Sequence, residues 1–158
     1  MRPLAVFDVD GVLADVRHRL PLLAQSPKQW DAFFAAAGND PLLDDGADLV
    51  RERARTDEIC YLTGRPERSR ALTEAWIERH GLPRGRLLMR PDGDHRPARA
   101  FKIEQLRAVR RRRAIALVVD DDPEVVRLLR ANGLPVLEAA WLPYSSPLAD
   151  AQEREGRT

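Results

Sequence analysis

Acidic residues follow two apolar stretches of this sequence and are the residues best suited to chemistry. Asp8 and Asp10 stand one residue apart after the apolar residues 4–7, and Gly11 follows them. Because unpaired buried carboxylates are costly, these two must meet solvent, a cation or a ligand. Gly11 permits a sharp turn that brings Asp10 back toward Asp8. We interpret one carboxylate as a nucleophile and the other as a proton shuttle, with a divalent cation between them. The alternative is a strand that runs into an ordinary Asp-Gly turn.

A second acidic cluster, residues 120–122, follows the apolar residues 115–119. Together with Asp8 and Asp10, Asp120 and Asp121 offer hard oxygen ligands and no cysteine, which favours Mg²⁺. Without a cation, so many carboxylates at one place would repel one another by several kcal/mol at low effective dielectric.

Three further residues could bind an anion at the same place. Thr63 and Gly64 follow the apolar residues 59–62, where a hydroxyl and free backbone N–H groups become available. Lys102 is one of only two lysines in a chain whose other basic residues are arginines, which favours a compact point charge. Read singly, Thr63 and Gly64 form an ordinary turn and Lys102 is a solvated surface lysine.

Short apolar segments alternate with helical patterns along the chain and must position these residues. We expect strands at residues 4–7, 59–62, 87–89, 115–119 and 135–137. We expect helices at residues 17–24, 26–38, 47–55, 66–80, 98–112 and 123–131. This alternation predicts an α/β fold with three layers, in which helices cover both faces of a five-stranded, mainly parallel sheet. A parallel sheet gathers the carboxyl ends of its strands at one edge, so the chemical residues should converge there.

The patterns within two of these helices make finer predictions. Ser26 as N-cap, Pro27 at the first position and Gln29 completing a capping box predict the start of the helix at 26–38. In the helix at 66–80, Leu72, Ala75, Trp76 and Arg79 should form the inner stripe.

Composition limits the remaining possibilities. The chain has 158 residues and a formal net charge of +1, which suits one domain and gives no argument from overall charge for nucleic-acid binding. The single Cys60 excludes an internal disulfide. There is no signal peptide and no apolar run of transmembrane length, so we expect a cytoplasmic protein with no membrane partner. The arginines at 110–113 read as a solvated helix end.

The ordered residues Asp8, Asp10, Thr63, Lys102 and Asp120 resemble the four motifs of the haloacid dehalogenase (HAD) superfamily phosphatases, which implies a Rossmann-like HAD fold. The finer pattern is similar to the 3′-phosphatase domain of phage-type polynucleotide kinase-phosphatase. The segments that carry it are Asp-Gly at 10–11, His-Arg-Leu at 18–20, Trp-Asp-Ala-Phe-Phe at 30–34, Thr-Gly-Arg at 63–65, Met-Arg-Pro at 89–91 and Gly-Asp-His-Arg-Pro at 93–97. No Gly-rich loop ending in Gly-Lys-Ser/Thr is present, so we expect no kinase half in this sequence.

The resemblance implies a mechanism. Asp8 would attack phosphorus and form an aspartyl-phosphate, and Asp10 would act as general acid and then general base. Mg²⁺ would be held by Asp8, the Asp10 carbonyl and Asp120, with Asp121 close by. Thr63, Gly64 and Lys102 would bind the phosphate.

The same resemblance places substrate-binding arginines at Arg19, Arg65 and Arg96. Two positions depart from the family pattern. Val12 replaces the usual Thr, and Ala98 replaces an acid four residues before Lys102.

The resemblance also divides the chain. Residues 1–144 would form the HAD phosphatase domain with a short helical insert at about 17–45, and residues 145–158 a polar, frayed tail. Such an insert amounts to a small or absent cap, which favours a bulky substrate such as a 3′-phosphorylated RNA or DNA end. A kinase or ligase partner would be encoded separately. The alternatives are a nucleotidase or other small-molecule phosphatase of this fold, or a non-catalytic binding module.

Overall fold

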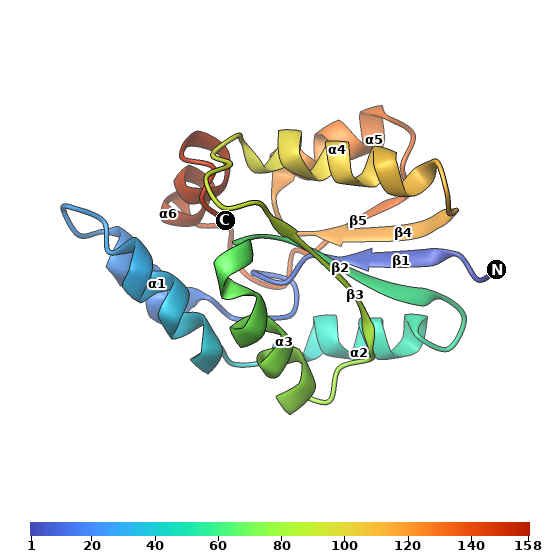
Figure 1. Ribbon diagram of the computed structural model, residues 1–158, viewed down its shortest axis with the longest axis horizontal. Helices are drawn as coiled ribbons and strands as arrows, with labels where there is room; N and C mark the ends of the chain where they lie inside the picture. The colour runs from blue at the N-terminus through green and yellow to red at the C-terminus, as the bar shows by residue number, and fades with distance from the viewer.

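The computed structural model describes all 158 residues and contains one five-stranded parallel sheet. The strand order is β3-β2-β1-β4-β5, so β1 is central and the chain builds outward from it on either side (Figure 1). The strands are β1 (Leu4–Phe7), β2 (Glu58–Pro66), β3 (Gly85–Arg90), β4 (Ile115–Asp120) and β5 (Val136–Glu138). The predicted α/β fold with a parallel sheet is confirmed.

Helices cover both faces of the sheet, which gives the three predicted layers (Figure 1). On one face lie α2 (Asp44–Arg53) and α3 (Arg70–Arg79), and on the other lie α4 (Ala98–Arg110) and α5 (Pro123–Ala131). Asp122 caps α5 as expected, because its carboxylate accepts the N–H of Glu124. No helix of the structure is both long enough and apolar enough to span a membrane.

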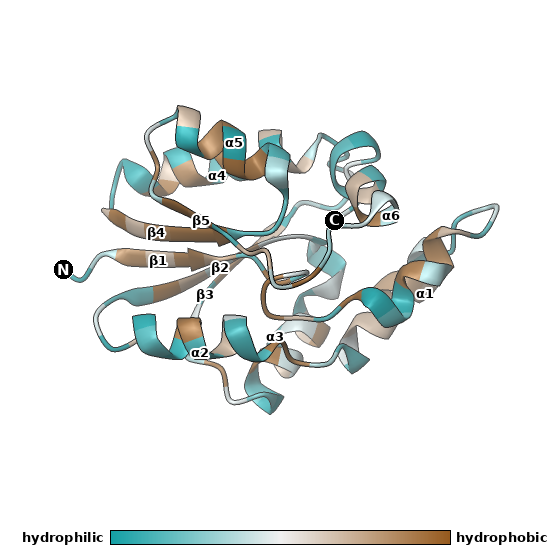
Figure 2. Ribbon diagram, turned by 180° about the vertical axis from the view of Figure 1, so that it is seen from behind, coloured by the Kyte–Doolittle hydropathy of each residue, from teal (hydrophilic) through white to brown (hydrophobic).

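The core lies in two layers because side chains alternate along the buried strands. Figure 2 shows β1 and β4 in the colours of hydrophobic residues. On β1, Ala5 and Phe7 face α2 and α3, whereas Leu4 and Val6 face α4 and α5. Every residue of β1 is buried, as expected for the central strand of a sheet covered on both sides.

A smaller group of helical segments lies beyond the carboxyl ends of the strands, outside the three layers. It contains a 3₁₀ helix (Arg17–Leu23), α1 (Trp30–Ala36) and α6 (Ser146–Ala149), followed by a π-helical turn (Asp150–Arg154). Leu23, Phe33 and Phe34 of the insert pack against Ala151 of the tail. Residues 146–154 of the tail that we expected to be frayed form these helical elements, and Ala151 completes the small core of the insert.

The predicted start of one helix differs from the structure. The helix expected from Ser26 begins only at Trp30, and the side chain of Gln29 bonds the carbonyl of Pro27 instead of closing a capping box. The first residues of the expected helix therefore belong to the loop before α1.

The predicted inner face of α3 also differs from the structure. The buried residues of α3 are Thr73, Trp76 and Ile77, whereas Ala75 and Arg79 are exposed. Trp76 faces inward as predicted, and a 3₁₀ turn at Glu67–Ser69 precedes the helix, which begins at Arg70 and not at Pro66. Thr73 is accommodated in the core because its hydroxyl donates to the carbonyl of Ser69.

Candidate active site

The carboxyl ends of β1, β2 and β4 bring the chemical residues together. The main chain of Asp8 still bonds to Val119 of β4, and the chain then turns sharply through Gly11, whose φ is 77°. A Cβ added at Gly11 would collide with the carboxylate of Asp121. Glycine is therefore required both for the turn and for the close approach of this acid.

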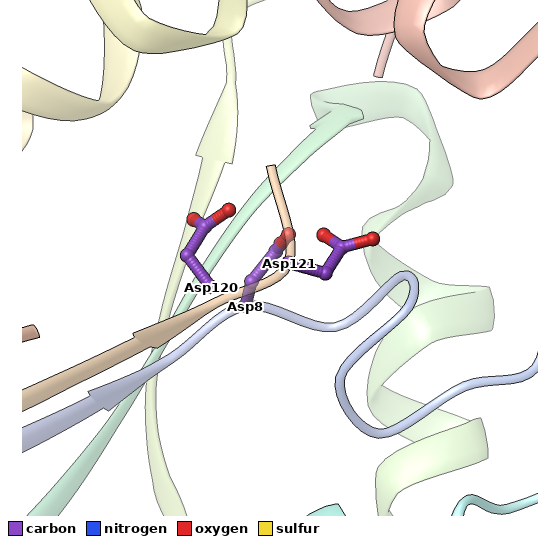
Figure 3. Close-up of side chains that lie close together, drawn as sticks. All are labelled: Asp8, Asp120 and Asp121. Carbon is purple, nitrogen blue, oxygen red and sulfur yellow. The ribbon is translucent and has the colours of Figure 1, made fainter. Parts of the chain in front are cut away.

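Three carboxylates form an acidic group at this edge (Figure 3). One oxygen from each of Asp8, Asp120 and Asp121 lies within 4.8 Å of the others. All three residues are buried. The structure thus brings together three of the four acids that the sequence predicts as metal ligands.

Lys102 lies beside this group although it is distant from both acids in the sequence. Its Nζ is 2.8 Å from Oδ2 of Asp8 and 2.6 Å from Oδ2 of Asp120. The side chain is 2% exposed, so it is not a solvated surface lysine. Burial lowers the pKa of Lys102, but Asp120 and Asp8 outweigh burial and raise it above its usual value, so the ammonium stays charged.

One ammonium does not compensate three buried carboxylates. Burial, only partly opposed by Lys102, raises the pKa of Asp8 to about 7. Burial together with repulsion by Asp8 raises the pKa of Asp121 well above its usual value. Oδ1 of Asp121 is buried and has no hydrogen-bond partner. An all-carboxylate donor set with an unpartnered buried oxygen fits a hard divalent cation such as Mg²⁺.

Asp10 lies in a different environment and takes no part in the acidic group with its side chain. Arg19 binds Oδ1 of Asp10 at 2.9 Å, and Arg65 binds the same oxygen at 2.9 and 2.6 Å. Burial raises the pKa of Asp10, but Arg65 and Arg19 outweigh it and hold the pKa well below its usual range. Asp10 is therefore an ionised carboxylate in this state of the protein.

Asp40 completes this ion-pair network and was missed by the sequence reasoning. It binds Arg19 at 2.9 Å and Arg65 at 3.0 Å, and the ring of His18 lies 2.7 Å from it. The network therefore holds two aspartates and two arginines, all buried. Two arginines predicted at one edge of the sheet require more negative charge than Asp10 alone supplies. The Asp-rich loop at 39–46 was the feature of the sequence that could have pointed to a second carboxylate.

The network also bears on the arginines predicted to bind substrate. The side chains of Arg19 and Arg65 are fully buried and directed at Asp10 and Asp40. Substrate binding by Arg19 and Arg65 stays a prediction. Their observed contacts hold the side chain of Asp10 in place. Arg96 is half-exposed on a loop, where it binds Asp94 at 2.7 Å and also pairs with Glu104. Its predicted contact with substrate is likewise untested.

Thr63 and Gly64 lie at the end of β2 as expected. Thr63 is fully buried, and its hydroxyl accepts the N–H of Arg65. The carbonyl of Gly64 accepts a hydrogen bond from Arg90 at 3.1 Å. A Cβ at Gly64 would collide with the main chain of Thr158, so the end of the tail passes directly over this part of β2, which continues to Pro66.

A doubly wound parallel sheet with acids at the carboxyl ends of β1 and β4 and a lysine on the intervening helix defines the HAD class of phosphatases. Solved structures support this fold. A HAD-like family protein of Streptococcus pneumoniae superposes with a TM-score of 0.59 at 14% identity, covering 96% of this chain and 91% of that one. A putative HAD hydrolase of Bacillus subtilis, solved with bound magnesium, has a TM-score of 0.57 at 12% identity, covering 85% and 87%.

Within this class, the profile described as "Polynucleotide kinase PNKP phosphatase domain" matches residues 3–141, and the chain belongs to that family. A chain from the "Pnkp1/Rnl/Hen1 RNA repair complex" superposes with a TM-score of 0.75 at 22% identity, covering 92% of this chain. The present chain spans only 44% of that longer chain. A comparison with curated proteins gave no significant match. The protein is therefore a HAD-type phosphatase, as its motifs predicted.

Proposed function

We propose that this protein is a Mg²⁺-dependent phosphatase that removes the 3′-phosphate from nucleic-acid ends through an aspartyl-phosphate on Asp8. The observation that carries the proposal is the contrast between the two acids of one motif. Asp8 lies beside Lys102 in the acidic group, whereas Asp10 is bound by two guanidinium groups outside it. Two carboxylates with such different environments are suited to two different catalytic roles.

In the first step, a carboxylate oxygen of Asp8 forms a bond to phosphorus while the bond from phosphorus to the alcohol oxygen breaks. Asp10 gives its proton to that leaving oxygen. Asp10 is ionised in the present structure, and the approach of a phosphate dianion would raise its pKa and let it take up this proton. In the second step, Asp10 removes a proton from water, which attacks phosphorus and releases phosphate from Asp8.

The remaining residues of the site handle the charge of the phosphoryl group. Lys102 is a buried cation in contact with Asp8 and is suited to neutralise phosphoryl oxygens in the transition state. Asp8, Asp120 and Asp121 are the side chains suited to hold Mg²⁺, with the Asp10 carbonyl as a further ligand implied by the family resemblance. Bound there, Mg²⁺ would polarise the phosphoryl group and offset its charge.

Three facts support a nucleic-acid end as the substrate. The family is that of the polynucleotide kinase phosphatase domain. The chain is similar in fold to part of a protein in a structure described as an RNA repair complex. The insert between β1 and α2 consists of short helices only. The choice between RNA and DNA ends, and separate kinase and ligase partners, are part of the proposal.

A phosphate-release assay tests the proposal. With Mg²⁺ present, a 3′-phosphorylated oligonucleotide should give a higher kcat/KM than a nucleoside 3′-phosphate, a 5′-mononucleotide or a sugar phosphate. Asp8→Asn should lose several orders of magnitude because it removes the nucleophile. Asp31→Asn, which changes a fully exposed carboxylate, is the matched control. Preference for a small metabolite would reject the nucleic-acid substrate, and turnover in Asp8→Asn would reject the covalent mechanism.

A further inference from the structure

The last residues of the chain lie inside the candidate site. After the π-helical turn at Asp150–Arg154, residues 155–158, here called the strap, cross the carboxyl edge of the sheet. Figure 1 shows this end of the chain between α6 and the carboxyl ends of the strands. Thr158 is 4% exposed, and its hydroxyl donates to Oδ2 of Asp10 at 3.0 Å. The strap therefore touches the residue to which we assign acid–base catalysis.

The strap lies directly above Gly64, near the carboxyl end of β2. The main chain of Thr158 lies against Gly64 so closely that no Cβ fits between them. Arg90, which is 2% exposed, bonds the carbonyl of Gly64 and also reaches the main-chain oxygen of Thr158 at 3.4 Å. A phosphate ester cannot reach Thr63 and Gly64 of β2 along this side while the strap is in place.

The hydrogen bond between the Thr158 hydroxyl and Asp10 resembles the contact that the leaving alcohol oxygen would make with Asp10 in the proposed reaction. Arg19 and Arg65 both bind Oδ1 of Asp10, which leaves Oδ2 for another partner. In the proposed reaction that partner is the oxygen of the alcohol that leaves phosphorus. The hydroxyl of Thr158 is also an alcohol, and it occupies the hydrogen-bonding position that the leaving oxygen would need.

Partly exposed side-chain contacts of Glu155 and Arg157 help to hold the strap, and water or salt ions can replace them. Glu155 pairs with Lys28, both about one third exposed, and Arg157 stacks over Trp30 at 5.3 Å. Ion pairs of this exposure contribute little, and salt weakens them further. Gly156 has a φ of 56°, and a Cβ there would collide with the carbonyl of His95. Apart from the contacts of Thr158, the path of the strap thus depends on one glycine and two partly exposed side-chain contacts.

We propose that the channel filled by the strap is the subsite for the alcohol portion of the substrate, and that substrate must displace the strap to bind. This inference rests on the proposed function, and it makes the strap an internal competitor of the substrate. If the substrate is a nucleic-acid end, the channel receives the terminal sugar and the strand attached to it. Displacement also frees Asp10 from the hydrogen bond of Thr158.

Two substitutions release the strap without changing a proposed catalytic group. Gly156→Val should expel it, because the side chain collides with His95 and disfavours the positive φ. Gly133→Val is the matched control, since Gly133 also has a positive φ but no atom lies near its added Cβ. Thr158→Val keeps the shape of the side chain and removes only the donor to Asp10, so it serves if Gly156→Val does not fold.

Release of the strap should lower KM for both p-nitrophenyl phosphate and a 3′-phosphorylated oligonucleotide. A strap that is closed about nine-tenths of the time raises the apparent KM about tenfold, so the expected decrease is roughly three- to tenfold at similar kcat. Gly133→Val should leave KM unchanged. An unchanged or higher KM in both Gly156→Val and Thr158→Val would overturn the inference, because the strap would then be a fixed part of the site that substrate does not displace.

Hydrogen exchange gives a readout that does not require turnover. The N–H of Arg157 bonds the carbonyl of Ala151, so its exchange should be slow while the strap is closed. In the Asp8→Asn protein, inorganic phosphate or the 3′-phosphorylated oligonucleotide should accelerate exchange in the peptide that covers residues 150–158. Unchanged exchange at saturation with both probes overturns the inference. If the wild-type protein hydrolyses no phosphate ester but exchange accelerates in the Asp8→Asn protein, the proposed function fails and the subsite stands.

Discussion

Replacing Asp121 by Asn should change stability in opposite directions with and without Mg²⁺. Asp121 lies in a group of three buried carboxylates, and its Oδ1 has no partner. Without metal, Asp121→Asn removes one repelling charge and should raise the melting temperature. With Mg²⁺ present, the same substitution removes a ligand, so the stabilisation by the metal should shrink.

The size of the first effect follows from the spacing. Two unit charges 4.8 Å apart interact by about 3.5 kcal/mol at an effective dielectric of about 20. Lys102 offsets part of this repulsion, which leaves a net gain of roughly 1–3 kcal/mol. For a chain of this length each kcal/mol corresponds to roughly 2–4 °C, so the increase should be about 2–12 °C.

The second effect follows from binding linkage. Mg²⁺ at a hundredfold excess over its Kd stabilises the native state by about 2.7 kcal/mol. A tenfold weaker site removes about 1.4 kcal/mol of that stabilisation. Thermal unfolding of wild type and Asp121→Asn across a Mg²⁺ titration therefore measures both effects in one experiment.

Asp31→Asn is the matched control for this experiment. Asp31 lies in the first turn of α1 with a fully exposed side chain, far outside the acidic group. Its Mg²⁺ response should equal that of wild type. If Asp121→Asn lowers the melting temperature without metal and leaves the Mg²⁺ increment intact, the proposed repulsion and the proposed metal site are both refuted.

Three further predictions concern the neighbouring residues. Asp40→Ala should lower the free energy of unfolding in urea by about 3–5 kcal/mol, because it leaves two buried guanidinium groups undercompensated. The control Asp31→Ala should leave the free energy of unfolding unchanged, and an equal response of both variants would argue against the network. Lys102→Met should lower kcat/KM by about 100-fold or more with little change in shape, and near-normal turnover would remove it from the site. Arg96→Ala should weaken cleavage of the oligonucleotide but not of an aryl phosphate and reduce the salt slope by about one, with Arg51→Ala as the control; identical salt slopes would exclude a phosphate contact by Arg96.

The sequence predicted the sheet and the acidic edge because both depend on rules that act over short segments. Buried strands appear as apolar runs, and parallel order follows from their alternation with helices. Once the strands are parallel, their carboxyl ends must meet, which brings Asp8 and Asp120 together. Lys102 required the family pattern in addition, because its own helix would allow it to face solvent.

The parts that were not predicted depend on long-range pairing without a local pattern. Asp40 acquires its importance only when two arginines from other segments reach it. On the inner face of α3 the buried Thr73 was missed, because a polar residue there is accommodated only by its hydrogen bond to the carbonyl of Ser69. The order of residues 145–158 comes from contacts of Ala151 with the insert and of Thr158 with Asp10, and the polar composition of this segment gave no sign of either.

The buried ion-pair network joins four separate segments of the chain through balanced charge. Asp10 and Asp40 supply two negative charges, and Arg19 and Arg65 supply two positive charges. Loss of any one of these charges leaves an uncompensated ion in the interior. Evolutionary drift at these four positions is therefore coupled, and a replacement at one of them can persist only together with a compensating replacement at another. Among related sequences these positions should vary jointly or not at all.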